Sequence, residues 1–298
     1  MDNENAVIGD ESTGAGDRNG GASGESTGDG LAYASAPGLD VVLDGPVLRL
    51  TLDRPTKRNA INDAMMYGLI DAIAQAGTDE AVRVILLRGN GADFCGGADI
   101  VARNAAGGAR PRAGSIQRRL PLQAHRLIPL VREVQTPVVC AVRGWTTGIG
   151  LALAVAADVT VAATDARFWA PFSERGFTPD SGLTWLLPRR VGEVRARRML
   201  LLGERVDAAT AVDWGLIHAA TATEELDATV GDLVARLAAG PTVGLGLTKW
   251  LMHAGASDNL DDHLRGEAFG MELSSRSEDF REGLAAFAAR RSPNFKGR

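Results

Sequence analysis

The chain has 298 residues, of which 45% are hydrophobic and 23% charged, so it has the composition of a globular protein with a sizeable core. Its two cysteines are too few for a disulfide framework or a four-thiolate metal site, and they favour a reducing, cytoplasmic location. The formal net charge of −5 conceals an asymmetry, since the first 30 residues carry −6 and the remainder +1. A general nucleic-acid surface is therefore not expected.

Residues 1–37 are predicted to form a disordered acidic tail. The first 30 positions contain eight glycines and almost no large apolar side chains, so they cannot bury enough surface to offset the entropy lost on ordering. A secretory signal is not expected, because the N-terminal segment has no basic start followed by an apolar run. The longest apolar stretch, 151–163, is interrupted by Asp158 and is too short to span a bilayer. We therefore expect no membrane association.

The segments after the tail alternate between predicted strands and predicted helices. Asp44-Gly45 between two apolar runs predicts a β-hairpin, and Asn62 is placed to cap a helix. The strands predicted from apolar runs are residues 41–43, 47–52, 82–87, 137–142 and 159–162. The predicted helices are residues 63–76, an amphipathic stretch over 115–134, and a short apolar helix that ends near Ala157.

From Val191 onward the periodicity is helical nearly to the end of the chain. Glycines 203, 215, 240 and 283 are the expected breaks between these helices. Strands and helices that alternate first, followed by helices alone, predict an α/β domain with a helical C-terminal extension.

Two glycine-rich segments each follow a predicted strand: the first glycine loop (residues 89–97) and the second glycine loop (residues 144–150). A dinucleotide fingerprint is excluded in the first loop, because Phe94 replaces the third glycine and residues 100–132 contain no acid to hold a ribose. Backbone amides of two such loops could instead converge on one oxygen as an oxyanion hole. The alternative is that the glycines only permit tight turns.

Several motifs together resemble the enoyl-CoA hydratase/isomerase (crotonase) family. The segments that carry the resemblance are 51–62, the G-x-x-F-x-x-G-x-D motif at 91–99, 141–150, 202–217 and 282–295. The resemblance covers about residues 38–298. It implies a crotonase spiral of ββα units over 38–235 and a helical trimerisation region over 236–298. It also implies an acyl-CoA substrate, a homotrimer or hexamer, and no cofactor beyond the coenzyme A of the substrate.

The resemblance also implies roles for individual residues. The oxyanion amides fall on Gly96 and Ile149, which would hold the thioester oxygen as an enolate develops. The positions matching the family's coenzyme A site are Lys57, Arg58, Ala60, Gly97, Ala98, Asp99 and Lys296. For the three cations among them, the alternative is a solvated surface charge.

This chain departs from the family's hydratases at both water-activating glutamates. Alignment of the motifs puts Ala152 at the first position and Phe172 at the second, and neither side chain can activate water. Glu174 lies two residues beyond the second position, where only a local shift of the chain would bring it back. A standard hydratase mechanism is therefore not favoured.

Asp180 matches the catalytic aspartate of certain isomerases in the family, and its surroundings resemble those of the ring-opening isomerases of phenylacetate breakdown. It would move a proton between two carbons of the substrate, a reaction for which one base suffices. Phe172 would line the acyl pocket. The alternative for Asp180, from its place before Ser-Gly-Leu-Thr, is that it caps a helix.

Other functions stay open at this point. An enoyl-CoA hydratase of fatty-acid or aromatic-acid breakdown is the main alternative to the isomerase. In a hydrolase or dehalogenase, Asp180 would be the nucleophile and His125 would activate water. Cys95 as a nucleophile would need an activating base. A chain that lacks both glutamates could also be a non-catalytic subunit that binds coenzyme A.

Overall fold

The computed structural model describes residues 32–99 and 112–298, and Leu31–Arg298 forms one compact unit. Residues 32–37, which were expected to belong to the tail, lie against the core. The Tyr33 hydroxyl donates to Asp79 Oδ2 at 3.0 Å, and the Ala36 N–H donates to the Leu39 carbonyl at 2.9 Å. The predicted end of the tail at residue 37 is therefore too late, and the rest of the predicted tail lies outside the described residues.

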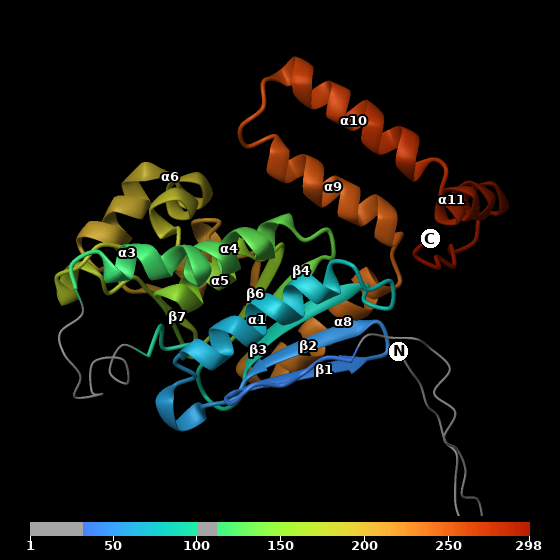
Figure 1. Cartoon of the computed structure of the whole chain (residues 1–298). Coiled ribbons are helices and arrows are strands. Elements are labelled where there is room, and N and C mark those ends of the chain that lie inside the picture. The colour runs from blue at the N-terminus through green and yellow to red at the C-terminus, as the bar shows by residue number, and fades with distance from the viewer. Residues whose placement is uncertain (1–31, 100–111) are drawn as a thin grey trace, which may run out of the picture. The chain divides into compact units, whose positions relative to one another are not determined.

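A six-stranded sheet forms the centre of this unit (Figure 1). β1 (Leu39–Asp44) and β2 (Val47–Leu52) form the predicted hairpin, in which Asp44 lies opposite Val47. The sheet continues in parallel from β2 in the order β1-β2-β3-β4-β6-β9. Its other strands are β3 (Val84–Gly89), β4 (Val138–Val142), β6 (Val159–Ala163) and β9 (Ala219–Thr221).

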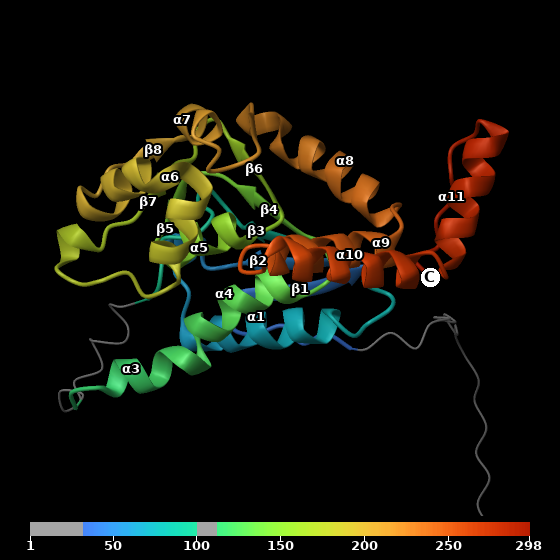
Figure 2. The same cartoon turned by 90° about the horizontal axis from the view of Figure 1, so that it is seen from above.

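Helices cover both faces of this sheet (Figure 2). α1 (Asp63–Ala76) and α4 (Ala124–Glu133) lie on one face, and α8 (Leu226–Ala238) lies on the other. In β3, Ile85 and Leu87 belong to the core on the side of α1 and α4, whereas Val84 and Leu86 belong to the core on the side of α8. A strand covered on both faces is apolar at every position, which is why the apolar runs predicted strands correctly.

A second sheet has three strands, in the order β5-β7-β8. β5 (Trp145–Thr147) follows β4, β7 (Arg167–Trp169) follows β6, and β8 (Val206–Asp207) completes the sheet. α5 (Ile149–Ala156) follows β5, and α6 (Leu183–Leu201) follows β7. These β4-β5-α5 and β6-β7-α6 repeats are the ββα units expected of the crotonase spiral.

The amphipathic stretch 115–134 is divided rather than continuous. α3 (Ser115–Arg119) and a 3₁₀ turn (Leu120–Leu122) precede α4, and Gln123 between them has the non-helical angles φ −125° and ψ −109°. Pro121 lies in the first turn of this 3₁₀ segment, where no backbone N–H is needed. Because proline cannot donate a hydrogen bond inside a helix, it favours the division of the stretch at this point.

The final third is mostly helical, as predicted, but the short strands β8 and β9, which were not predicted, interrupt it, and two further details differ. α8 spans the expected domain boundary at 235/236 and packs on the sheet, so the C-terminal region begins after it. Gly283 lies inside α11 (Glu278–Ala289), where Phe295 packs 3.5 Å from the place a Cβ would occupy. The other helices of this region are α7 (Ala208–Asp213), which precedes α8, and α9 (Thr242–Ala254) and α10 (Leu260–Ser274), which follow it. Within residues 32–99 and 112–298, no helix has the length and apolarity needed to cross a membrane.

Candidate active site

The two glycine loops lie side by side and are held together by backbone hydrogen bonds. The Cys95 N–H donates to the Trp145 carbonyl at 2.9 Å, and the Thr147 N–H donates to the Cys95 carbonyl at 2.8 Å. On the other side of the first loop, the Ile61 N–H donates to the Gly97 carbonyl at 2.8 Å. The first loop is thereby fixed against the start of α5, as an oxyanion hole built from two loops requires.

Glycines in the second loop allow this close approach. Gly148 precedes α5 with φ 55° and ψ −117°, which a residue with a side chain rarely adopts. A Cβ on Gly150 would lie 2.6 Å from Cys95 Cβ and 2.9 Å from the Cys95 carbonyl oxygen. The simple reading that these glycines permit tight geometry is therefore correct, and it is compatible with a role for the amides.

A small cavity of about 30 Å³ opens where the loops meet. It brings together six of the predicted site residues, which are Gly96, Gly97, Ala98, Ile149, Phe172 and Asp180. Ser181 and Phe177 also line it, although no role was predicted for either. Phe177 meets Phe172 edge to face, with ring centroids 5.5 Å apart, so that together they form an apolar wall.

The two predicted oxyanion amides differ in their availability. Ile149 is the first residue of α5, so its N–H has no acceptor within the helix, and it donates to no acceptor in the described part of the chain. The Gly96 N–H donates to the Arg58 carbonyl at 2.6 Å. A thioester oxygen could bind the Ile149 amide directly, whereas it would have to share or replace the bond to Arg58 at Gly96.

Asp180 does not cap a helix. The N-cap of α6 is Gly182, with φ 76°, and no side chain caps this helix. The Asp180 carboxylate instead accepts a hydrogen bond from the buried Ser181 hydroxyl at 2.9 Å. Asp180 also lines an adjoining cavity of about 470 Å³, to which His125 contributes. The carboxylate therefore borders the space where a ligand would lie.

The two positions predicted to match the family's water-activating glutamates are apolar in this structure. Ala152 is completely buried in α5, and Phe172 is a wall of the small cavity. Glu174 does not line that cavity, because its side chain lies against Gly203, with Oε1 2.9 Å from the place a Cβ would occupy. The local shift that would return Glu174 to the site is not present.

The predicted coenzyme A residues fall into two groups. Lys57 and Arg58 are exposed beside the first loop, and Arg58 Nε lies 3.8 Å from Asp93 Oδ2. Arg54 contacts two other predicted coenzyme A residues: it donates to the Ala60 carbonyl at 2.6 Å and forms an ion pair with Asp99 at 2.9 Å. These residues lie on the rim of the same loop region, and their contact with coenzyme A stays a prediction.

Lys296 is separated from that group within the chain. It lines another cavity together with acidic side chains, among them Glu278 and Glu282, and its Nζ bonds to Asn294 Oδ1 at 3.3 Å. The structure does not bring Lys296 to Lys57 and Arg58, and its coenzyme A contact stays a prediction.

Cys95 is not a plausible nucleophile. It is fully buried, and burial raises the pKa of its thiol to about 12, so the reactive thiolate is scarce at neutral pH. In the described ranges no group of His, Cys, Asp or Glu is arranged to hold a metal ion.

Replacing Gly150 with alanine is expected to damage both stability and activity. The added methyl would meet the Cys95 backbone, which two strand-like hydrogen bonds fix in place, so the loops must separate. Overpacking of this kind typically costs about 1–3 kcal/mol of unfolding free energy. Urea unfolding and turnover of Gly150→Ala test this, with Gly231→Ala in α8 as the control, because nothing lies within 4 Å of a Cβ there. Equal effects of the two variants would contradict it.

Comparison with known proteins identifies the family. The family model described as enoyl-CoA hydratase/isomerase matches residues 44–298. The chain is 40% identical over 254 residues to 1,2-epoxyphenylacetyl-CoA isomerase of Escherichia coli (strain K12), a match that covers 85% of this chain and 95% of that protein. It is 37% identical over 268 residues to a protein of Rhodobacter capsulatus described as a probable enoyl-CoA hydratase, covering 90% and 98% of the two chains.

A solved structure agrees with these sequence matches. An enoyl-CoA hydratase from Polaromonas sp. JS666 superposes with a TM-score of 0.80 and 29% identity, covering 87% of this chain and 99% of that one. The resemblance expected from the motifs is thus confirmed, and membership of an enzyme family counts against the non-catalytic alternative. The chain belongs to the enoyl-CoA hydratase/isomerase family and has its crotonase fold.

Proposed function

We propose that the protein is an acyl-CoA isomerase that moves a proton between two carbons of the acyl chain. The observation that carries this proposal is the composition of the small cavity. Asp180 is the carboxylate among its lining residues, which also include Gly96 and Ile149. An apolar Phe172 stands where the family's hydratases carry a glutamate.

In the proposed mechanism the thioester oxygen accepts hydrogen bonds from the Ile149 amide and from the Gly96 amide, where it shares or replaces the bond to the Arg58 carbonyl. Asp180 removes a proton from one carbon, the C–H electron pair delocalises toward the thioester oxygen, and an enolate forms. The same carboxyl then returns the proton to a second carbon, so no water is consumed. Each oxyanion donor typically stabilises such a transition state by about 3–4 kcal/mol. The Ser181 hydroxyl, 2.9 Å from Asp180 Oδ1, orients the carboxylate.

Product analysis in labelled water tests this proposal. The protein is incubated with Δ2-enoyl, Δ3-enoyl and ring-epoxide CoA esters in H₂¹⁸O, and the products are analysed by mass spectrometry. An isomerase gives products of unchanged mass without ¹⁸O. Products that contain one added H₂¹⁸O would overturn the isomerase in favour of the hydratase.

Hydratase activity is the second candidate, and the names of relatives such as the Rhodobacter capsulatus protein support it. It would require Asp180 to position water without a glutamate at either family position. A hydrolase is favoured by one observation, that His125 and Asp180 line the same larger cavity. Free coenzyme A released with ¹⁸O in the acid product would identify the hydrolase.

We also propose a homotrimer, or a hexamer of two trimers, on the basis of the C-terminal helices. Large apolar side chains on α10 and α11 are strongly exposed in the single chain, among them Leu260 (70%), Phe269 (71%) and Phe287 (86%). Exposed apolar surface of this extent is typical of an interface. Sedimentation equilibrium would measure the mass of the assembly.

A further inference from the structure

The cavity at the oxyanion amides is too small for the thioester that they would bind. Its volume of about 30 Å³ has room for about two water molecules. A thioester brings a carbonyl group, a sulfur atom and the carbons on both sides. The structure is therefore a closed form of the site, and part of the cavity wall must move before a substrate can enter.

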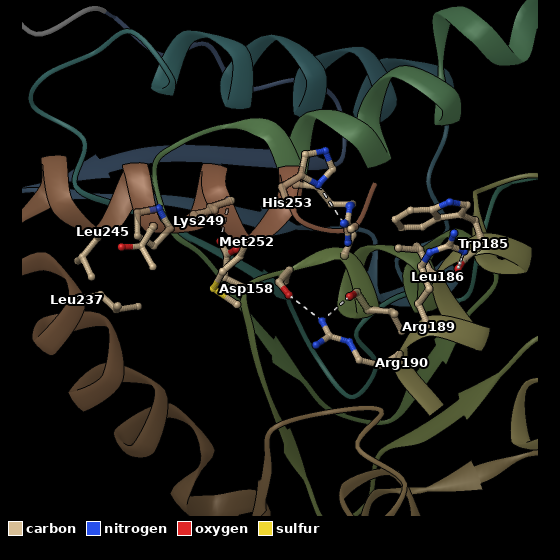
Figure 3. A pocket seen from close by; sticks show the side chains of 17 residues that line it. Asp158, Trp185, Leu186, Arg189, Arg190, Leu237, Leu245, Lys249, Met252 and His253 are labelled. Carbon is tan, nitrogen blue, oxygen red and sulfur yellow. Dashed lines mark hydrogen bonds and ion pairs between the residues drawn. The ribbon is translucent and has the colours of Figure 1, made fainter. Parts of the chain in front are cut away.

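A much larger space lies directly beyond one part of this wall. Asp180 and Ser181 line both the small cavity and the cavity of about 470 Å³. Arg132, Trp185 and His253 line that large cavity and also a third one, of about 410 Å³, which we call the cationic cavity (Figure 3). Its basic lining residues are Arg132, Arg189, Arg190 and Lys249. Displacement of the residues shared by the first two cavities would join the oxyanion amides to a space that can hold an acyl chain.

Residues 177–181, which we call the strap, form the wall between the small and the large cavity. Phe177 lines the small cavity and Pro179 the large one, whereas the two residues that follow line both. The strap connects the 3₁₀ turn that follows β7 to the start of α6. Asp180, the proposed base, is therefore carried by the segment that separates the two spaces.

Few contacts hold the strap in place. In the part of the chain that the structure describes, one hydrogen bond joins it to residues outside it, from the Phe177 N–H to the Phe172 carbonyl at 3.2 Å. The opposite wall of the small cavity is fixed more firmly, because Gln123 is buried and donates to Asp63 Oδ1 at 3.0 Å. The first glycine loop is bonded to its neighbours on both sides. Of these parts of the wall, the strap costs the least free energy to displace.

A glycine in the left-handed conformation lies at each end of the strap. Gly176 has φ 72° and ψ 28°, and Gly182 has φ 76° and ψ 3°. Nothing lies within 4 Å of the place a Cβ would occupy on Gly176, so packing does not demand a glycine there. A glycine does, however, adopt positive and negative φ about equally well, which suits a hinge.

We propose that the strap opens on Gly176 and Gly182 to admit the acyl chain and then closes, which brings Asp180 against the bound thioester. This inference rests on the proposed binding of an acyl-CoA thioester at the oxyanion amides, but not on the isomerase reaction. Because Asp180 lies within the strap, the base reaches its working position only when the substrate is enclosed. Closure also excludes water from the enolate, since Phe177 then packs edge to face on Phe172.

A reversible cross-link tests whether the strap must open. The hydrogen bond between Phe177 and Phe172, and their ring centroids 5.5 Å apart, bring the two positions close enough for a disulfide after Phe172→Cys and Phe177→Cys. The natural Cys95 and Cys140 are buried and do not compete. Association of hexanoyl-CoA, a saturated ester, is followed by tryptophan fluorescence. The oxidised form should bind about 100-fold more slowly than the reduced form of the same protein, because the minor open state is lost, and dithiothreitol should restore the rate.

Alanine at the first hinge provides a second measurement. A side chain disfavours the left-handed conformation, so Gly176→Ala should destabilise the closed strap in the free and the bound protein alike. Association and dissociation of hexanoyl-CoA should both become about five-fold faster, with the affinity nearly unchanged. Gly45→Ala is the matched control, because Gly45, in the turn between β1 and β2, also has a positive φ (55°) and nothing within 4 Å of a Cβ. It should change neither rate.

The outcomes separate the strap from the isomerase. An oxidised protein that binds as fast as its reduced form, or rates in Gly176→Ala equal to those of Gly45→Ala, would overturn the strap, and product analysis in H₂¹⁸O would still decide the isomerase. If the two cysteine substitutions themselves abolish binding, the two alanine variants decide alone. Binding that depends on strap opening, without any proton shift, would support the strap and overturn the isomerase. A wild-type protein that binds no hexanoyl-CoA would overturn both.

Discussion

Asparagine in place of Asp180 is expected to lower the isomerase turnover number by about 10²- to 10⁴-fold, the usual contribution of a general acid–base group. The amide has the same shape and can still accept the hydrogen bond from Ser181, but it cannot take up a proton at neutral pH. The oxyanion amides and the cavity walls are unchanged, so acyl-CoA binding should change little. Loss of turnover with binding retained is the signature of a residue that acts in the transition state.

The measurement is the rate of double-bond migration, with binding of a saturated CoA ester followed by calorimetry. Asp213→Asn is the matched control, because Asp213 is an exposed aspartate at the end of α7. An Asp180→Asn protein that keeps the full isomerase rate would refute the proposed mechanism. Equal losses of binding and turnover would instead assign Asp180 a structural role.

Elements with local signals could be predicted from the sequence. The hairpin follows from Asp44-Gly45 between apolar runs, and α1 begins where Asn62 accepts the Met65 N–H at 2.9 Å. Strands β5, β7 and β8 have two or three residues each and exist because they pair with one another. No periodicity can be read over so few positions.

Glycine and aspartate show the limit of local reasoning most clearly. Gly283 was expected to end a helix, but Phe295, a residue distant in sequence, packs against its bare face and the helix continues. From the sequence, Asp180 could be either a catalytic residue or a helix cap. In the structure Gly182, in a left-handed conformation, occupies the N-cap position of α6, so Asp180 does not cap the helix. Tertiary packing therefore decides the outcome at Gly283, and the backbone conformation of the neighbouring Gly182 decides it at Asp180.

The site divides in the same way. The glycine loops and Asp180 could be located from motifs, and the cavity that joins them is consistent with those motifs. The bond between the Gly96 amide and the Arg58 carbonyl could not be anticipated. The cationic cavity was not predicted either, because Arg132, Arg189 and Lys249 come from three helices that share no motif.

The ion pair between Lys249 and Asp158 gives the second large expected effect. Lys249 joins α9 to the core, since its Nζ lies 2.7 Å from Asp158 Oδ2 and donates to the carbonyls of Val131 at 2.9 Å and Thr136 at 3.2 Å. Its side chain is only 9% exposed. Lys249→Met fills the same space but leaves the half-buried Asp158 carboxylate and the carbonyls of two buried residues without this donor, so we expect a loss of about 3 kcal/mol in unfolding free energy. Lys57→Met, at an exposed lysine, should change it by less than about 0.5 kcal/mol.

The pH dependence of this loss identifies its cause. Burial raises the pKa of Asp158, and the nearby Lys249 lowers it, so removal of the lysine should raise that pKa further. A carboxyl whose pKa is higher in the folded state than in the unfolded state destabilises the protein above its unfolded pKa, and protonation relieves the penalty as the pH falls. The deficit of Lys249→Met should therefore shrink between pH 7.5 and pH 5.5, and Asp158→Asn added to it should recover part of the loss. Urea unfolding at one fixed protein concentration measures both. A deficit that is the same at both pH values would show that lost packing, rather than an uncompensated carboxylate, accounts for it.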